Sequence, residues 1–338
     1  MQTVANPRGE IWNRIKWPLL ALALVLAFNF LFTPGFFRIE MKDGRFYGSL
    51  IDILNRAAPV MLLSLGMTLV IATGGVDLSV GALMALAGSI AALLISKGTF
   101  SLPLVIAVSL GVAALAGCWN GTLVACLKVQ PIVATLILMV AGRGIAQLLT
   151  GGQIITFENK SFEFMARGAF LSLPFTITIV ALVYAAVGIV TRRTALGLFI
   201  ECVGDNETAS RYSGIQTSAV KVASYAFSGF CAGLGGLILA ADIKAADANN
   251  AGLYLELDAI LAVVIGGTAL TGGRFFLLSS LAGAVLIQAL TTTILTRGIP
   301  VEFTLVVKAI VIVIVCLLQS EAFRNALWRR MRPALLKT

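Results

Sequence analysis

Residues 53–96 read ILNRAAPVMLLSLGMTLVIATGGVDLSVGALMALAGSIAALLIS. This stretch holds two apolar runs, 53–73 and 79–96, which meet at a cluster rich in glycine. A helix needs about 20 mostly apolar residues to cross the hydrocarbon core of a membrane, and each run is close to that length. Barrel strands are shorter and alternate in polarity, so the stretch predicts two membrane-spanning helices with a break between them.

Runs of the same kind recur along the whole chain. We predict about ten spans, near 17–33, 53–73, 79–96, 103–127, 131–150, 173–191, 219–241, 257–267, 275–296 and 303–320. The run 257–267 is too short to cross alone. Of the 338 residues 59% are hydrophobic and 12% charged, whereas a soluble chain carries about 25% charge. The predicted fold class is therefore all-α, a polytopic integral membrane protein with some helices short or interrupted.

Basic residues lie beside the spans, not in one patch, so the net charge of +9 does not indicate a nucleic-acid partner. Three segments are basic: Arg8, Arg14 and Lys16; Arg192, Arg193, Arg211 and Lys221; Arg324, Arg329, Arg330, Arg332 and Lys337. The positive-inside rule places these segments in the cytoplasm, and an even number of spans puts both termini there. We predict a cytoplasmic tail 1–16, a transmembrane domain 17–320 with a cytoplasmic loop 192–221, and a cytoplasmic tail 321–338.

The bias in charge is moderate, because the opposite loops are also basic. They carry Arg38, Lys42, Arg45, Lys97, Lys160, Arg167, Lys244 and Arg297. The first span is long for a signal peptide and no small-residue cleavage pattern follows it, so we expect an uncleaved helix.

Several residues and motifs that chemistry requires are missing from the sequence. It has no histidine, the commonest general base and metal ligand, and none of its five cysteines forms a C-x-x-C pair. We therefore predict no metal site and no catalytic residues. It also lacks G-x-x-x-x-G-K-[ST], so any nucleotide that drives it must bind to another chain.

Charged residues inside the spans are functional candidates, because isolated charge in hydrocarbon is costly. They are Arg56, Arg143 and Lys308, with Asp77 and Asp258 near span ends. Arg143 is equally explained by snorkelling to the outer interface or by binding carbonyl groups there. An ion-coupled carrier would show acids at the membrane centre, and the sequence indicates none clearly.

Glycine clusters interrupt the apolar pattern at 71–81 and 264–274. Interrupted segments in the two halves of a chain indicate a transport path, although a plain turn between helices is an equal alternative. Asp77 or Ser79 is a candidate cap for the helix that follows. The candidate path comprises Thr73, Gly74, Gly75, Asp77, Ser79, Asn120, Gln130, Thr135, Gly266 and Gly267. For Asn120, Gln130 and Thr135, hydrogen bonding between helices is an equally good explanation.

The loop 192–221 contains a short predicted helix, 207–213. Asn206 is its expected N-cap, and Gly214 its left-handed C-terminal stop. Ala209, Tyr212 and Ile215 form an apolar side that so short an element cannot bury itself. This pattern favours docking into a groove on a partner, with a position on the membrane surface as the alternative.

Four motifs identify a family. They are TGGVDLSVGA (73–82), WNGTLVACLKVQPIVATL (119–136), GLFIECVGDNETASRYSGI (197–215) and LELDAILAVVIGGTALTGGRF (255–275). With them the chain resembles the permease subunits of bacterial ATP-binding-cassette sugar importers, in the ribose, xylose, arabinose and galactose branch. DILNRAAP (52–59), MVAGRGIAQLLTGGQI (139–154) and ADIKAADANNAGLYLELDAI (241–260) make it most similar to permeases of galactofuranose importers.

The resemblance implies a multi-pass protein of the bacterial inner membrane that moves a monosaccharide into the cytoplasm. It implies a dimer with a second copy or a related permease, an ATPase subunit below, and a periplasmic sugar-binding protein above. The chain would bind no cofactor, and ATP would be used by the partner. The segment contacting the ATPase would include Gly204, Asn206, Ala209, Tyr212, Gly214 and Ile215. The alternative is a secondary, ion-coupled carrier.

Overall fold

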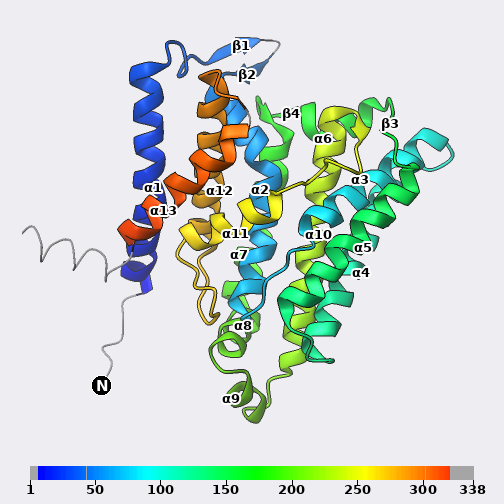
Figure 1. Ribbon diagram of the computed structural model, residues 1–338, viewed down its shortest axis with the longest axis vertical. Coiled ribbons are helices and arrows are strands. Elements are labelled where there is room, and N and C mark those ends of the chain that lie inside the picture. The colour runs from blue at the N-terminus through cyan, green and yellow to red at the C-terminus, as the bar shows by residue number, and fades with distance from the viewer. Residues whose placement is uncertain (1–6, 43, 301, 320–338) are drawn as a thin grey trace, which may run out of the picture.

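The computed structural model describes residues 7–42, 44–300 and 302–319, and these form an almost entirely helical protein (Figure 1). The predicted C-terminal tail and its basic residues lie outside the described residues. The helices are α1 (Pro7–Phe32), α2 (Ser49–Ala72), α3 (Val80–Lys97), α4 (Leu102–Ala125), α5 (Pro131–Thr150), α6 (Lys160–Arg167), α7 (Phe175–Arg193), α8 (Leu196–Asp205), α9 (Glu207–Tyr212), α10 (Thr217–Ile243), α11 (Leu255–Ile265), α12 (Leu277–Thr296) and α13 (Glu302–Gln319).

All ten predicted spans are helices, so the predicted all-α fold class is confirmed. Eight of them are long and apolar enough to cross a membrane, namely α1 to α5, α7, α10 and α12. Helix α11 has 11 residues and, as the sequence indicated, is too short to cross. In α13 the apolar part is Phe303–Val315. Helix α1 begins at Pro7, so the last ten residues of the predicted N-terminal tail are its first turns.

Helices α2, α3 and α10 form the centre of the protein, and α1, α4, α5 and α7 surround it. Helix α10 packs along α4 at very short range, because glycines face each other across the contact. A Cβ on Gly229 would overlap the carbonyl oxygen of Ala113, and one on Gly117 would overlap that of Tyr225. Apolar side chains gain little by leaving lipid for protein, so close backbone packing of this kind stabilises the bundle.

Short strands lie mainly at one end of the bundle, the upper end in Figure 1. They are β1 (Glu40–Lys42), β2 (Arg45–Tyr47), β3 (Ile155–Thr156), β4 (Ala169–Phe170), β5 (Leu173–Pro174) and β6 (Ala245–Ala246). They pair as β1–β2, β3–β6 and β4–β5, all antiparallel.

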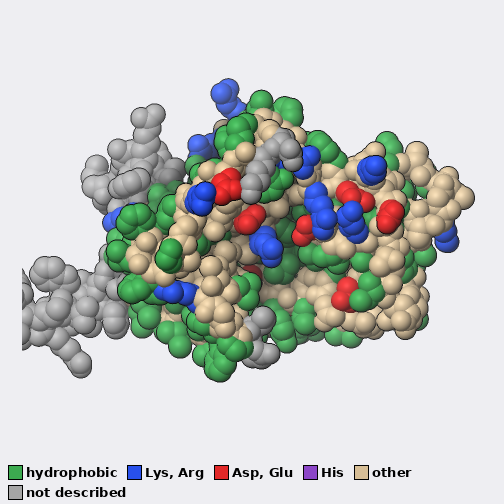
Figure 2. Space-filling view, turned by 90° about the horizontal axis from the view of Figure 1, so that it is seen from above, with side chains coloured by type: hydrophobic (Ala, Val, Ile, Leu, Met, Phe, Trp, Pro, Cys, Tyr) green, Lys and Arg blue, Asp and Glu red, His purple; other side chains and the backbone are tan. Residues whose placement is uncertain are grey.

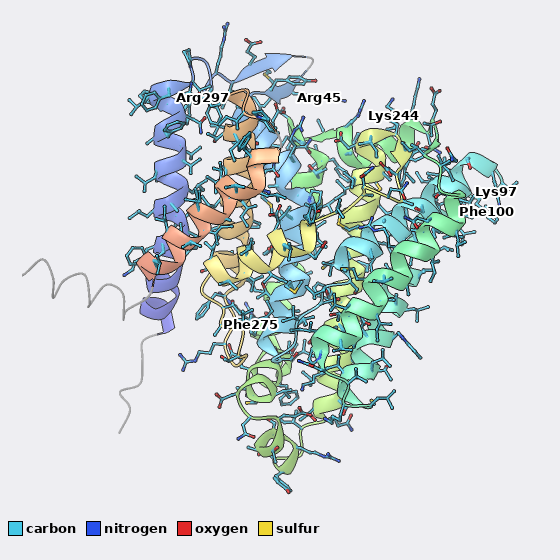
Figure 3. The ribbon with its side chains drawn as sticks, in the orientation of Figure 1. Arg45, Lys97, Phe100, Lys244, Phe275 and Arg297 are labelled. Carbon is cyan, nitrogen blue, oxygen red and sulfur yellow. The ribbon has the colours of Figure 1, made fainter. Side chains whose placement is uncertain are left out.

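The positive-inside rule assigned some segments to the cytoplasmic side of the membrane and others to the outer side. In the structure the two groups lie at opposite ends of the bundle. Arg45, Lys97, Lys244 and Arg297, all from predicted outer loops, lie toward the upper end (Figure 3). The start of α1 and the helices α8 and α9 lie at the lower end (Figure 1). This arrangement agrees with a cytoplasmic lower end.

Candidate translocation and coupling site

The first glycine cluster is a non-helical segment inside the protein. Helix α2 ends at Ala72, and the chain reaches α3 through residues 73–79, with Gly74 at φ +79°. The carboxylate of Asp77, fully buried, accepts hydrogen bonds from the amide of Ser79 (3.1 Å), the hydroxyl of Ser79 (2.6 Å) and the hydroxyl of Ser228 on α10 (2.8 Å). Ser79 is the N-cap residue of α3, as one of the two predictions had it, but its own side chain makes no capping hydrogen bond; the carboxylate of Asp77 binds the Ser79 amide instead.

Two more candidate path residues join this cluster from α4 and α5. The amide nitrogen of Asn120 donates to the Ser79 hydroxyl at 3.0 Å. The hydroxyl of Thr135 approaches the carbonyl oxygen of Val76 at 3.4 Å, as does that of Tyr225. Hydrogen bonds between segments therefore account for these polar groups in the present conformation, except for the side-chain oxygen of Asn120, which is buried without a partner among the described residues. Asp77, Ser79, Asn120 and Thr135 are all buried.

Replacing Asp77 with leucine is expected to lower the free energy of unfolding by about 3 kcal/mol, because the Ser79 and Ser228 donors lose a buried acceptor. Asp77→Asn keeps one oxygen acceptor and is expected to cost about 1 kcal/mol. Thermal unfolding of the purified chain in detergent measures both. Equal stability of Asp77→Leu and the native chain would contradict this role.

The remaining candidate path residues lie elsewhere. Thr73, also buried, donates its hydroxyl to the Val70 carbonyl at 2.8 Å. Gln130 is exposed in the turn before α5 and does not join the Asp77 cluster. Gly266 packs against Ser279 and Ser280 where α11 meets α12, and Gly267 follows at φ +83°.

The two glycine clusters meet α8 at the lower end of the protein. The amide of Gly273 donates to the carbonyl of Ala72 at 3.0 Å. Gly204, near the end of α8, lies so close that a Cβ there would overlap the Ala72 carbonyl oxygen and lie 2.5 Å from the Gly273 nitrogen. We call Ala72, Gly204 and Gly273 the glycine junction. It connects the loop 192–221 directly to both interruptions.

Helix α9 is built as the sequence predicted, one residue shorter. The Asn206 side chain accepts from the Ala209 amide at 2.9 Å, Ser213 is the C-cap, and Gly214 has φ +86°. Ala209 is exposed and Tyr212 is 89% exposed. Ile215 instead packs against the protein's own core, so the unburied apolar side has two of its three predicted members.

Two lysines hold α9 against the bundle. The carboxylate of Glu207 pairs with Lys128 of the α4–α5 turn and with Lys221 of α10, at 2.6 Å each. Hydrogen bonds from the two ammonium groups lower the pKa of Glu207. The carboxyl therefore stays ionised at neutral pH, and α9 is tied to the inner ends of α4, α5 and α10.

A third non-helical segment was not singled out from the sequence. After β6 the chain turns inward through residues 247–254, with Gly252 and Tyr254 at positive φ, and enters α11. Arg143 of α5 donates to the carbonyls of Ala248 (3.1 Å) and Ala251 (2.6 Å). Arg143 therefore binds backbone carbonyls, which is one form of the structural explanation that the sequence offered beside a functional role. The shortness of the run 257–267, after the polar stretch KAADANN (244–250), was the available signal.

The structure also shows how the other charged residues of the predicted spans are accommodated: two form an ion pair, and one is exposed. Lys308 of α13 pairs with Asp258 of α11 at 2.8 Å, and both side chains are nearly buried. Lys308 thus does not reach an interface, as the sequence suggested it could. Arg56 is exposed in the first half of α2, toward the upper end.

An all-α bundle with interrupted helices and buried polar breaks is the architecture of a polytopic membrane transport protein. The family model described as "Branched-chain amino acid transport system / permease component" matches residues 49–316, and the chain belongs to this family. It is thus a multi-pass protein of the inner membrane.

Several curated relatives match nearly the whole chain. The galactofuranose transporter permease protein YtfT of Escherichia coli K12 is 55% identical, over 92% of each chain. The fructose import permease protein FruF of Bifidobacterium longum is 38% identical, over 96% of this chain and 93% of that protein. The ribose import permease protein RbsC of Escherichia coli K12 is 34% identical, over 95% and 98%. No solved structure matches.

Proposed function

We propose that this chain is the membrane-spanning permease of an ATP-binding-cassette importer that carries a monosaccharide, of the galactofuranose type, into the cytoplasm. The identity of 55% to YtfT over 92% of both chains supports the substrate. The relatives named for fructose and ribose support the wider class of sugar. The chain performs no covalent chemistry on the sugar and binds no cofactor, because a separate subunit hydrolyses the ATP.

The proposed assembly contains two permeases, either two copies of this chain or this chain and a related one. An ATPase subunit docks on α9 at the lower end, where Ala209 and Tyr212 are exposed. A periplasmic sugar-binding protein delivers from the upper end. In the view from above, acidic and basic side chains gather around a hollow in the middle of this face (Figure 2).

The glycine junction is the observation that carries the mechanism. A push on α9 moves α8, and Gly204 transmits the movement to the Ala72 carbonyl and the Gly273 amide. A crevice of about 260 Å³ beside α8, lined by Val187, Leu196 and Val220 among others, leaves room for the movement. Both interruptions then shift together, and the permease changes from outward-facing to inward-facing. Such switching needs two packings of similar energy.

Purification of the chain with its partners, followed by ATPase assays with a panel of sugars, tests the proposal. We expect an ATPase to co-purify and galactofuranose, delivered by the binding protein, to stimulate hydrolysis more than ribose or fructose. A preparation without an ATPase would contradict the importer. Stimulation by another sugar alone would contradict the substrate.

An ion-coupled carrier is the second candidate, and the buried carboxylate of Asp77 is the observation that favours it. Proton carriers use intramembrane acids of this kind. Uptake that collapses with an ionophore but survives ATP depletion would establish the carrier. We expect the opposite, because Asp77 is held by three hydrogen bonds from its neighbours.

Replacing Ala209 with tryptophan and Gly214 with valine is expected to abolish uptake while the chain still inserts into the membrane. The indole would keep α9 out of a groove on the ATPase, and valine is strained at φ +86°. Uptake of radiolabelled sugar and the amount of chain in membranes measure the two effects. Leu115→Trp, on the exposed face of α4, is the control for a bulky substitution. Normal uptake by the double variant would refute the coupling role of α9.

A further inference from the structure

Residues 247–254, which we call the re-entrant segment, enter the bundle from its upper end. Helix α10 and strand β6 carry the chain to that end, and the segment then returns toward the middle, where α11 begins (Figure 1). None of its residues was a candidate for the solute path in the sequence. Its position and its polar side chains together indicate a function.

Two lengths indicate that the inner end of the segment lies deep within the membrane region, well below the upper end of the bundle. Gly252 packs against Gly81, since a Cβ on Gly252 would lie 2.5 Å from the Gly81 carbonyl oxygen. Gly81 lies 16 residues before Lys97, the end of α3, which is about 24 Å along that helix. Helix α11 has 11 residues, about 16 Å, or half of a hydrocarbon core of about 30 Å.

The segment is held in place by side chains of α5 and by its own first residue. Arg143 binds two of its carbonyls, and Gln147 donates to the Asn249 side chain at 2.7 Å. The carboxylate of Asp247 accepts from the amides of Asn249 and Asn250, at 3.0 and 3.1 Å. Asn250 also donates its side-chain nitrogen to Asp247 at 2.8 Å. These hydrogen bonds fix the shape of the re-entrant segment, so its exposed side is a defined surface.

The outward side of this surface is largely polar, and Leu253 is its exposed apolar member. Asn249 and Asn250 are exposed, and Tyr254 is 49% exposed. Non-helical backbone and amide side chains are not stable against lipid tails, because their hydrogen-bonding groups would be unsatisfied there. The surface therefore faces water or another protein chain, and not lipid tails.

We propose that the re-entrant segment lines the outer half of the translocation path, and that Asn249, Asn250 and Tyr254 contact the sugar in transit. The inference rests on the proposed function and names residues for it. A carboxamide both donates and accepts, as a sugar hydroxyl does, and the face of a tyrosine ring packs on the C–H groups of a sugar. A translocation path needs only a few contacts with the sugar, because tight binding would slow the release of the sugar.

Cysteine labelling tests whether the segment faces water. Asn249→Cys and Asn250→Cys are treated in whole cells with a membrane-impermeant maleimide, with the native chain as background. Leu148→Cys is the matched control, because Leu148 is 82% exposed next to Gln147 on α5 and is expected to face lipid. Thiols react as thiolates, which need water, so we expect the two variants to react at least about tenfold faster than the control. Equal, slow labelling of all three would overturn the proposal.

Sugar uptake tests the contact itself. Tyr254→Leu is expected to reduce uptake about tenfold, because it removes the ring contact with the sugar. Asn250→Ala is expected to reduce uptake about fivefold, because it removes the hydrogen bond from the carboxamide. Tyr254→Phe keeps the ring and should retain severalfold more uptake than Tyr254→Leu. Unchanged uptake by Tyr254→Leu and Asn250→Ala would overturn the contact. Co-purification of the ATPase with each variant verifies assembly.

The two arms separate this proposal from the function on which it rests. If the native chain transports no sugar, the proposed function fails, while the labelling still reports whether the segment faces water. If the native chain transports sugar and the segment does not label, only the present proposal fails.

Discussion

Lys308→Met is expected to lower the free energy of unfolding by about 3–5 kcal/mol, because it leaves the Asp258 carboxylate buried without its partner. The pair joins α13 to α11 across 2.8 Å, and the exposed fractions of the two side chains are 10% and 12%. With so little water nearby, an unpaired charge here has no other solvation. Thermal unfolding in detergent and the amount of chain in membranes measure the loss.

The double variant Asp258→Leu/Lys308→Met is the matched control. Replacing a buried ion pair with apolar side chains is often neutral in stability, so we expect most of the loss to be recovered. Uptake by this variant shows whether the pair also serves transport. A single variant as stable as the native chain would show that the pair does not hold α13 against α11.

Gly204→Ala is expected to abolish uptake, and to lower the free energy of unfolding by about 3 kcal/mol through overpacking. The new methyl group would overlap the carbonyl oxygen of Ala72 and lie 2.5 Å from the Gly273 nitrogen. Both neighbours are backbone atoms, which cannot rotate away, so α8 must move from the glycine junction. Uptake assays combined with thermal unfolding separate the loss of coupling from the loss of fold.

Gly188→Ala on α7 is the control, because a Cβ there would meet no atom within 4 Å. It makes the same chemical change in a helix of the same bundle. We expect normal stability, since alanine is at least as good a helix former as glycine. If Gly204→Ala transports as well as Gly188→Ala, the junction does not couple α8 to the interruptions.

The amino-acid pattern predicted the helices well because each depends on a local property. A run of about 20 apolar residues must be helical in lipid, where every backbone group needs a partner within its own segment. The cap at Asn206 and the turn at Gly214 were predictable for the same reason, since both depend on a few adjacent residues. The helix end differed by one residue.

The placement of the polar residues was not predictable, because partners distant in sequence decide it. Asp77 could have capped α3, yet Ser228 of α10, 151 residues away, shares its carboxylate. Lys308 could have reached an interface, yet Asp258 lies beside it, 50 residues away in the chain. The short run 257–267 indicated an incomplete span without showing that the chain before it turns inward.

The sequence by itself determined that this protein lies in the membrane, because hydrophobicity is a sum over neighbouring residues. It also determined the helices, the interruption within residues 71–81 and the short capped helix α9. Only the tertiary structure decided that two glycine clusters and α8 meet at one junction, and that the re-entrant segment reaches Gly81. These are contacts between backbones, and they form where glycines from separate segments meet.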